Sequence, residues 1–217
     1  MCIGYAPPSM PRATPEKPAL IIRAMLVQRV QQQFIDSADV AYQCADALGA
    51  AVDAAIGAIL ATITGGGKVL VCGVGSGSAL AQLMVNHLLH GLERDRPALP
   101  ALLIQADAAR PDALARNIAA LALSDDMLLL LGEMGTAAGL VELVQTAHER
   151  DMTVLALTGA GGGPLARALR DTDVHVCVPH SRSVRISEMH HLVLNCICDG
   201  IDAQLMGDDA PEPENLE

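Results

Sequence analysis

Five short apolar stretches, separated by segments of helical periodicity, constrain the fold of this chain more than any other feature. The stretches are KVLVC from Lys68, LPALLIQ from Leu99, MLLLL from Met127, TVLAL from Thr153 and VHVCV from Val174. Strands that are nearly continuous apolar runs are buried on both faces, and their alternation with helices is typical of a parallel sheet. The sequence therefore predicts an α/β fold with a five-stranded parallel sheet and helices on both faces. The helices are expected over residues 78–92, 112–121, 136–150, a short segment near Leu165, and 183–206.

A helical arm precedes this alternating region. Apolar residues recur every three or four positions between residues 19 and 64, which is the spacing of an amphipathic helix. Gly49 is expected to divide the arm into two helices, and the three glycines at 65–67 are expected to end it. Because an apolar stripe outside a closed α/β domain must be buried against something, we expect a homodimer or homotetramer. The predicted organisation is a flexible tail at 1–18, a single domain at 19–206 that includes the arm, and an acidic tail at 207–217.

Composition and charge exclude several classes of partner. The formal net charge is −11 and aromatic residues make up 1% of the chain, so direct binding of nucleic acid is not expected. The N-terminal region lacks the apolar core of a signal peptide, and no apolar run approaches the ~20 residues of a membrane span. These features predict a cytoplasmic protein without membrane contact. The six cysteines are not paired as CxxC, and we expect buried thiols and no disulfides or zinc ligands.

Four loops that follow predicted strands carry glycines and polar residues: GVGSGS, GEMGTA, TGAGGGP and PHSRSV. The carboxyl ends of parallel strands share one edge of the sheet, where ligands of such folds bind. In the first loop, backbone N–H groups at a helix start can hold an anion. The candidate ligand-binding residues are Gly75, Ser76, Ser78, Thr136, Ser181, Ser183 and Arg185. For each hydroxyl taken alone, helix capping is the stronger explanation, and Thr136 is predicted to cap the third helix of the domain. Asp107 follows the second predicted strand and is at the edge where a site would lie, but turn capping explains it equally well.

Several segments together resemble one known family. They are CGVGSGS, ERDRPALPAL, DDMLLLLGEMGTAAGL, ERDMTVLALTGAGGGPLA and VCVPHSRSVRISEMHHLVLNCICDGID. These segments are similar to SIS (sugar isomerase) domains, within the branch that holds phosphoheptose isomerases and DnaA initiator-associating proteins of the DiaA type. The last segment resembles the DiaA type more. The resemblance implies a three-layer, flavodoxin-like fold, a homotetramer assembled partly through the N-terminal helices, and binding of a phosphosugar at the strand ends.

The resemblance also implies where catalytic groups should lie. Isomerases of this branch carry a zinc site and an acid–base pair, and the matching positions here are Leu83, His87, Ser187 and Asn195. All four have changed type, so we expect no cofactor, and zinc only if the protein is an isomerase. The family's phosphate loop resembles STSGNS, whereas this chain has GEMGTA with Glu133. A charge pair at 4 Å is worth ~4 kcal/mol at an effective dielectric of about 20, against ~1 kcal/mol for a neutral hydrogen bond. Phosphate binding is therefore expected to be weak unless Glu133 turns away.

Three functions remain open. The first is a non-catalytic SIS-domain protein that helps to assemble the replication initiator, with Leu205 and Met206 as a partner contact. The second is a phosphoheptose isomerase in which His87 and Glu188 have taken over proton transfer. The third is a sugar-phosphate sensor. Glu188 and Arg185 also have the i,i+3 spacing of an ion pair that stabilises a helix. A dinucleotide site is disfavoured, because Ser78 takes the third glycine place of G-x-G-x-x-G.

Overall fold

A computed structural model describes residues 16–105, 112–137 and 139–207. The chain divides into two compact units, Met1–Asp39 and Val40–Glu217, and the second holds the whole sheet. The helices are α1 (Glu16–Thr64), α2 (Gly77–His90), α3 (Ala113–Leu121), α4 (Leu140–His148), α5 (Gly163–Ala168) and α6 (Ser183–Met206). The strands are β1 (Val69–Gly73), β2 (Ala101–Ile104), β3 (Met127–Leu131), β4 (Thr153–Gly159) and β5 (Val174–Val178).

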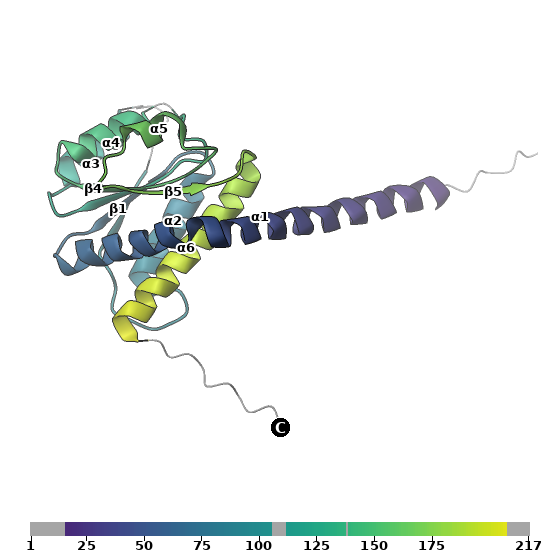
Figure 1. The fold of residues 1–217 in the computed structure, drawn as a ribbon, viewed down its shortest axis with the longest axis horizontal. Helices are drawn as coiled ribbons and strands as arrows, with labels where there is room; N and C mark the ends of the chain where they lie inside the picture. Colours follow the sequence, from purple (N-terminus) through teal and green to yellow (C-terminus); the bar gives the residue numbers. More distant parts are fainter. Residues whose placement is uncertain (1–15, 106–111, 138, 208–217) are drawn as a thin grey trace, which may run out of the picture. The chain divides into compact units, whose positions relative to one another are not determined.

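All five predicted strands are present in one parallel sheet with the order β2-β1-β3-β4-β5. This is the flavodoxin-like order, in which the ligand crevice lies between β1 and β3, where the strand order reverses. Both strands are completely buried along their length. The prediction of an α/β fold with a five-stranded parallel sheet is confirmed (Figure 1).

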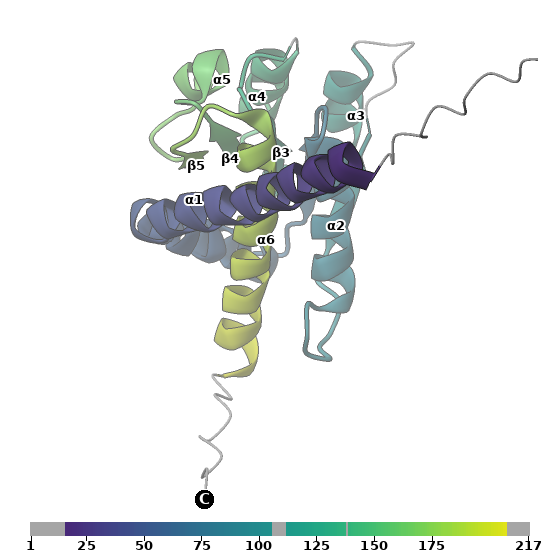
Figure 2. The same cartoon turned by 90° about the vertical axis from the view of Figure 1, so that its right-hand side faces the viewer.

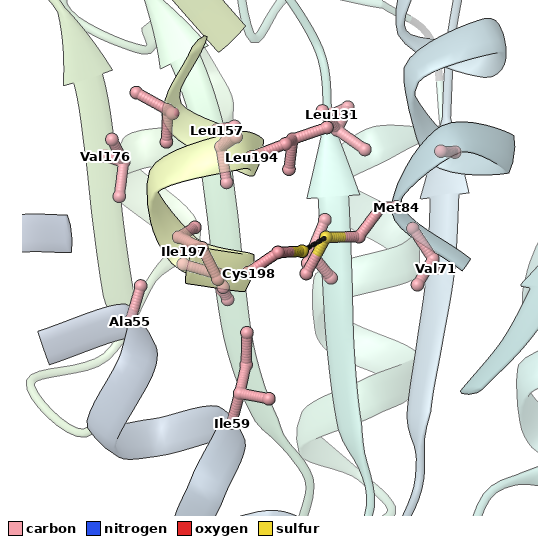
Figure 3. Packing of buried hydrophobic residues seen from close by; sticks show 14 of the residues in the cluster. Ala55, Ile59, Val71, Met84, Leu131, Leu157, Val176, Leu194, Ile197 and Cys198 are labelled. Atoms are coloured by element: carbon pink, nitrogen blue, oxygen red, sulfur yellow. Dashed lines mark hydrogen bonds between the residues drawn. The ribbon is translucent and has the colours of Figure 1, made fainter. Parts of the chain in front are cut away.

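Two apolar cores cover the two faces of the sheet. Side chains that alternate along β1, β3 and β4 divide between them, as the period of a strand requires. On one face, α2, α6 and residues 40–64 of α1 pack on the sheet; on the other, α3, α4 and α5 do so (Figures 1 and 2). In the first core, α2 and α6 lie side by side, with the Cys198 Sγ 3.7 Å from the Met84 Sδ (Figure 3). Ile59 of α1 lies beside this contact and is fully buried.

Helix α1 differs from its prediction at two places. It begins at Glu16, so residues 16–18 are helical although they were assigned to the flexible tail, and it passes through Gly49 without a break. A single glycine inside a helix costs only about 1 kcal/mol, and the burial of Leu48 and Ala55 on the core offsets that cost. The end at Thr64, directly before the three glycines, agrees with the prediction.

Helix α1 is also long and apolar enough to cross a membrane. An 18-residue window between Ile22 and Thr64 has a mean hydropathy of 1.8, and 17% of the window is buried. The expectation that no segment approaches a membrane span is therefore wrong on length and composition. Core helices of soluble proteins pass the same test, and α1 contributes core residues from Val40 to Ile59. The apolar character of the helix is thus weak evidence for a membrane.

The cysteines are more varied than expected. Cys44, Cys72 and Cys198 are buried free thiols, whereas Cys177 is half-buried and Cys196 is exposed. Burial raises the pKa of the Cys72 thiol to about 12, and with the nearby Asp202 carboxylate it raises the pKa of Cys198 to about 12. The buried thiols therefore behave as small apolar side chains.

A buried ion pair connects α6 to the segment between α2 and β2. The Arg96 Nε donates to an Asp202 carboxylate oxygen, and the two side chains are 1% and 3% exposed. The other guanidinium nitrogens of Arg96 donate to the carbonyl oxygens of His87 (2.8 Å) and Leu88 (2.9 Å) at the end of α2. Arg96 therefore stabilises the carboxyl end of α2 while holding it against α6.

Candidate functional site

The four post-strand loops that were predicted to form the site are hydrogen-bonded to one another or to a neighbouring strand at one edge of the sheet. Each link is a hydrogen bond between backbone groups. The links are Val74 N–H to Leu131 O (3.0 Å), Gly159 N–H to Glu133 O (2.7 Å) and Ala160 N–H to His180 O (3.0 Å). These bonds fix the relative positions of the loops, so side chains carried by different loops are held in a defined geometry.

A cavity of about 210 Å³ opens between the first and second of these loops, at the crevice between β1 and β3. Its lining residues are Val74, Gly75, Gly132, Glu133, Met134, Gly135, Thr136, Ala137 and Leu140. Among these described residues, Glu133 is the only one with an ionisable side chain. Two of the predicted ligand-binding residues, Gly75 and Thr136, thus lie at the cavity.

Thr136 does not cap a helix, contrary to the prediction. Helix α4 begins only at Leu140. The residue before it, Gly139, has a φ of +86°, which lies in the left-handed region. Gly135 has a φ of +61°, so the chain makes an extended loop between β3 and α4 before the helix starts. The hydroxyl of Thr136 is therefore on an exposed loop at the cavity.

The carboxylate of Glu133 does not turn away from the first loop. Its Oε1 accepts a hydrogen bond from the hydroxyl of Ser76, which joins the loops after β1 and β3. The carbonyl of Glu133 is held by Gly159, so the backbone position of the residue is also fixed. Ser76, predicted to donate to a ligand, donates instead to this carboxylate. The sequence indicates only that both residues lie at the same edge of the sheet, because each follows a strand, and it does not indicate the hydrogen bond between them.

Ser78 lines a second cavity, separate from the one beside Glu133. Its hydroxyl donates to the carbonyl oxygen of Gly73 (2.9 Å), which agrees with a local structural role. The second cavity, of about 240 Å³, is lined by Gly73, Ser78, Ala81, Leu103, Ile104 and Gln105. Asp107 lies outside the described residues.

His190 of α6 is fully buried near Glu133. Its Nε2 is 3.0 Å from the carbonyl oxygen of Thr158, and because a carbonyl only accepts, Nε2 carries the hydrogen and Nδ1 is an acceptor. Nδ1 is buried and has no hydrogen-bond partner within the described part of the chain. Burial lowers the pKa of His190, and this effect outweighs the opposing influence of Thr158 and Glu133, so the ring is neutral at pH 7. Its neighbour His191 is exposed, as expected for adjacent histidines on a helix.

The predicted ligands at the start of α6 have different surroundings. Ser181 and Ser183 are exposed, and neither belongs to the described lining of the cavity beside Glu133. Arg185 is 2% exposed, and its Nη1 donates to a Glu188 carboxylate oxygen at 2.5 Å. This i,i+3 contact is the helix-stabilising pair that the sequence allowed.

His87 and Glu188 were the residues predicted to take over proton transfer if the protein is an isomerase. Glu188 forms an ion pair with Arg185, whereas the ionisable groups that act on His87 are His191 and Asp202. Burial and the nearby His191 lower the pKa of His87, while Asp202 raises it, and the net shift is downward. A neutral imidazole at pH 7 is able to accept a proton, but the described groups that influence the His87 ring do not include Glu188.

The residues at the positions implied for zinc do not form a suitable ligand set. Leu83 offers no donor atom, Ser187 a hydroxyl, and Asn195 an amide, so His87 is the one strong zinc ligand among the four. In the described ranges, no group of three or more His, Cys, Asp or Glu side chains is arranged to hold a metal ion. The Asn195 Oδ1 is buried without a hydrogen-bond partner in the described residues. Its amide oxygen is a poor zinc donor compared with a histidine nitrogen or a thiolate.

A comparison with protein-family models identifies residues 33–159 as an SIS domain. The match covers more than half of the chain, including the cavity and its two loops. The chain belongs to the SIS domain family. A solved phosphoheptose isomerase from Neisseria gonorrhoeae is similar to this SIS protein with a TM-score of 0.76 and 32% identity, over 82% of this chain and 99% of the other.

Curated relatives fall into both branches named in the sequence analysis. A phosphoheptose isomerase of Methylibium petroleiphilum is 43% identical over 85% of this SIS protein and 97% of the relative. A DnaA initiator-associating protein DiaA of Serratia proteamaculans is 36% identical over 83% of this chain and 97% of the relative. The resemblance to this branch of the family is confirmed, and the relatives include proteins named for an enzyme and for a binding function.

Proposed function

We propose that this SIS protein is a non-catalytic binding protein with an altered sugar-phosphate cleft. The observation that carries the proposal is the carboxylate of Glu133, which lies at the cavity between β1 and β3 and is held there by Ser76. A negative charge at this place opposes a bound phosphate, and the neutral His190 does not compensate for it. The cleft is therefore a poor site for the phosphate end of a sugar.

The replaced catalytic positions support the same proposal. Proton transfer through an enediol needs an acid and a base within hydrogen-bond reach of the substrate. Leucine at position 83 performs neither role, and Asn195 does not titrate. His87 retains a titratable ring, but the described ionisable groups that act on this ring are His191 and Asp202.

A protein partner is the functional ligand in this proposal. The DiaA relative of Serratia proteamaculans is named for association with the DnaA initiator, and the similarity spans nearly all of that protein. Leu205 and Met206, at the end of α6, are 45% and 39% exposed, which suits an apolar contact. The protein would then act in the cytoplasm during initiation of replication, through its partner and without direct contact to DNA.

A phosphoheptose isomerase is the second candidate. The chain is 43% identical to a relative named phosphoheptose isomerase and 36% identical to the DiaA protein, and the higher identity favours this candidate. In that case His87 would be the base and Glu188 a second acid–base group. A sugar-phosphate sensor is the third and would bind its ligand without turnover or partner.

Two measurements on the full chain separate these functions. We expect no isomerisation of sedoheptulose 7-phosphate, with or without added zinc, and binding of a purified DnaA initiator in a direct pulldown. In the pulldown, the double variant Leu205→Glu with Met206→Glu should lose binding. The control Leu123→Glu, on another exposed apolar side chain, should keep it. Turnover that is lost in a His87→Ala variant would replace the proposal by the isomerase, and phosphosugar stabilisation without an initiator contact would replace it by the sensor.

Self-association through the helical arm is a further part of the proposal. Every residue from 22 to 35 of α1 is exposed in the single chain, and these include Leu26, Val30 and Phe34, which is 74% exposed. We expect Phe34→Glu to reduce the oligomer to a smaller species in light scattering, because a buried unpaired charge is costly. Gln28→Glu adds the same charge about 120° away around the helix and should leave the size unchanged. A wild-type monomer would contradict the proposal.

A further inference from the structure

The cavity beside Glu133 combines one negative charge and the hydroxyl of Thr136 with a lining that is otherwise apolar side chains and backbone. Val74, Met134 and Leu140 contribute apolar side chains, and Glu133 contributes the only ionisable group among the described lining residues. The hydrogen bond from Ser76 holds the carboxylate, and the bond from the Gly159 N–H to the Glu133 carbonyl fixes the backbone of the residue. A carboxylate in a partly apolar cavity interacts more strongly with a charged partner than it would in bulk water.

His190 of α6, a buried residue whose pKa is influenced by Glu133, also offers a hydrogen-bond acceptor. The Nδ1 of His190 is an acceptor, because the Nε2–H is used by the carbonyl of Thr158. This nitrogen is buried without a hydrogen-bond partner in the described residues, and His190 interacts electrostatically with Glu133. Both groups therefore require hydrogen-bond donors, which an ammonium supplies and a phosphate dianion does not.

We propose that the Glu133 cavity binds a small polyhydroxylated compound with a primary ammonium group, such as an amino sugar, in place of a phosphosugar. The ammonium donates to the carboxylate of Glu133, and its carbon chain contacts Val74 and Leu140. The cavity volume of about 210 Å³ corresponds to roughly seven water molecules at ~30 Å³ each, which is enough for the ammonium and several carbons of such a ligand. This inference rests on the proposed non-catalytic function, because it replaces the phosphosugar as the ligand of the same cleft.

The test uses three probes that share one carbon skeleton and differ in charge: glucamine with a primary ammonium, sorbitol without charge, and sorbitol 6-phosphate. In calorimetric titrations of the full-length protein at pH 7, glucamine should bind at least about tenfold more tightly than sorbitol. Sorbitol 6-phosphate should bind more weakly than sorbitol. In Glu133→Gln, the advantage of glucamine should disappear and sorbitol 6-phosphate should gain affinity.

Two further variants keep the test decisive. Glu149→Gln removes the same charge from an exposed residue at the opposite end of α4, and it should bind all three probes as the wild type does. Ser76→Ala keeps the Glu133 charge but removes the hydrogen bond that holds its carboxylate, so the preference for glucamine over sorbitol should shrink without reversing, and this result can be read even if Glu133→Gln does not fold. The proposal is overturned if sorbitol 6-phosphate is the tightest ligand of the wild type, if Glu133→Gln folds and changes neither preference, or if no probe binds. Turnover of sedoheptulose 7-phosphate would instead overturn the proposed function, whatever the order of the probes.

Discussion

Asp202→Ala is expected to lower the free energy of unfolding by about 3 kcal/mol or more, because it leaves the guanidinium of Arg96 buried without its counter-charge. The backbone carbonyls of His87 and Leu88 still accept from Arg96, but they carry no full negative charge. Denaturant unfolding at a fixed protein concentration measures the loss, and the concentration must be fixed because association contributes to stability.

Two companion variants show whether burial causes the effect. Arg116→Ala breaks an exposed i,i+4 contact with Asp112 at 3.4 Å, and it should change stability by less than about 1 kcal/mol. The double variant Arg96→Met with Asp202→Leu removes both buried charges and should recover much of the stability lost in Asp202→Ala. If Asp202→Ala is no more harmful than Arg116→Ala, the ion pair does not hold α2 against α6.

Gly135→Ala is the second change for which a large effect is expected. A Cβ at this position would lie 1.9 Å from the carbonyl oxygen of Gly162, and the φ of +61° is itself unfavourable for alanine. Backbone strain and the steric overlap together should cost about 3 kcal/mol or more and move the loop after β3, which lines the cavity, away from the loop after β4. Thermal unfolding measures the stability, and binding of glucamine reports on the cavity.

Gly139→Ala is the matched control for Gly135→Ala. Gly139 has a similar φ of +86°, but a Cβ there would meet nothing within 4 Å. It should therefore show only the penalty of the left-handed conformation, about 1–2 kcal/mol. Equal losses in the two variants would mean that contact between the loops contributes nothing beyond backbone strain.

The fold was predictable because its signals are local and repeated. Apolar runs such as MLLLL become central strands whenever helices cover both faces, and the same physical requirement produced β1, β3 and β4. The errors lie where one glycine decides a boundary. Gly49 was expected to end a helix but is carried through by its packed neighbours, whereas Gly139, at φ +86°, delays the start of α4 beyond Thr136.

The candidate site was predictable in location and less so in chemistry. The position of Glu133 at the strand edge followed from the parallel sheet, and its opposition to phosphate followed from its charge. Its hydrogen bond with Ser76 depends on how two loops approach each other, which sequence spacing does not encode. The unpartnered Nδ1 of His190 likewise depends on tertiary packing, because only the position of β4 assigns its other nitrogen to Thr158.

The proposed function requires that this member of the SIS family binds its ligands without catalysing isomerisation. The most direct test is to incubate the purified full chain with sedoheptulose 7-phosphate, with and without zinc, and to measure the isomerised product beside an active phosphoheptose isomerase. We expect a rate indistinguishable from that of the protein-free control in both conditions. Product formation that requires the chain and is abolished in His87→Ala would contradict it.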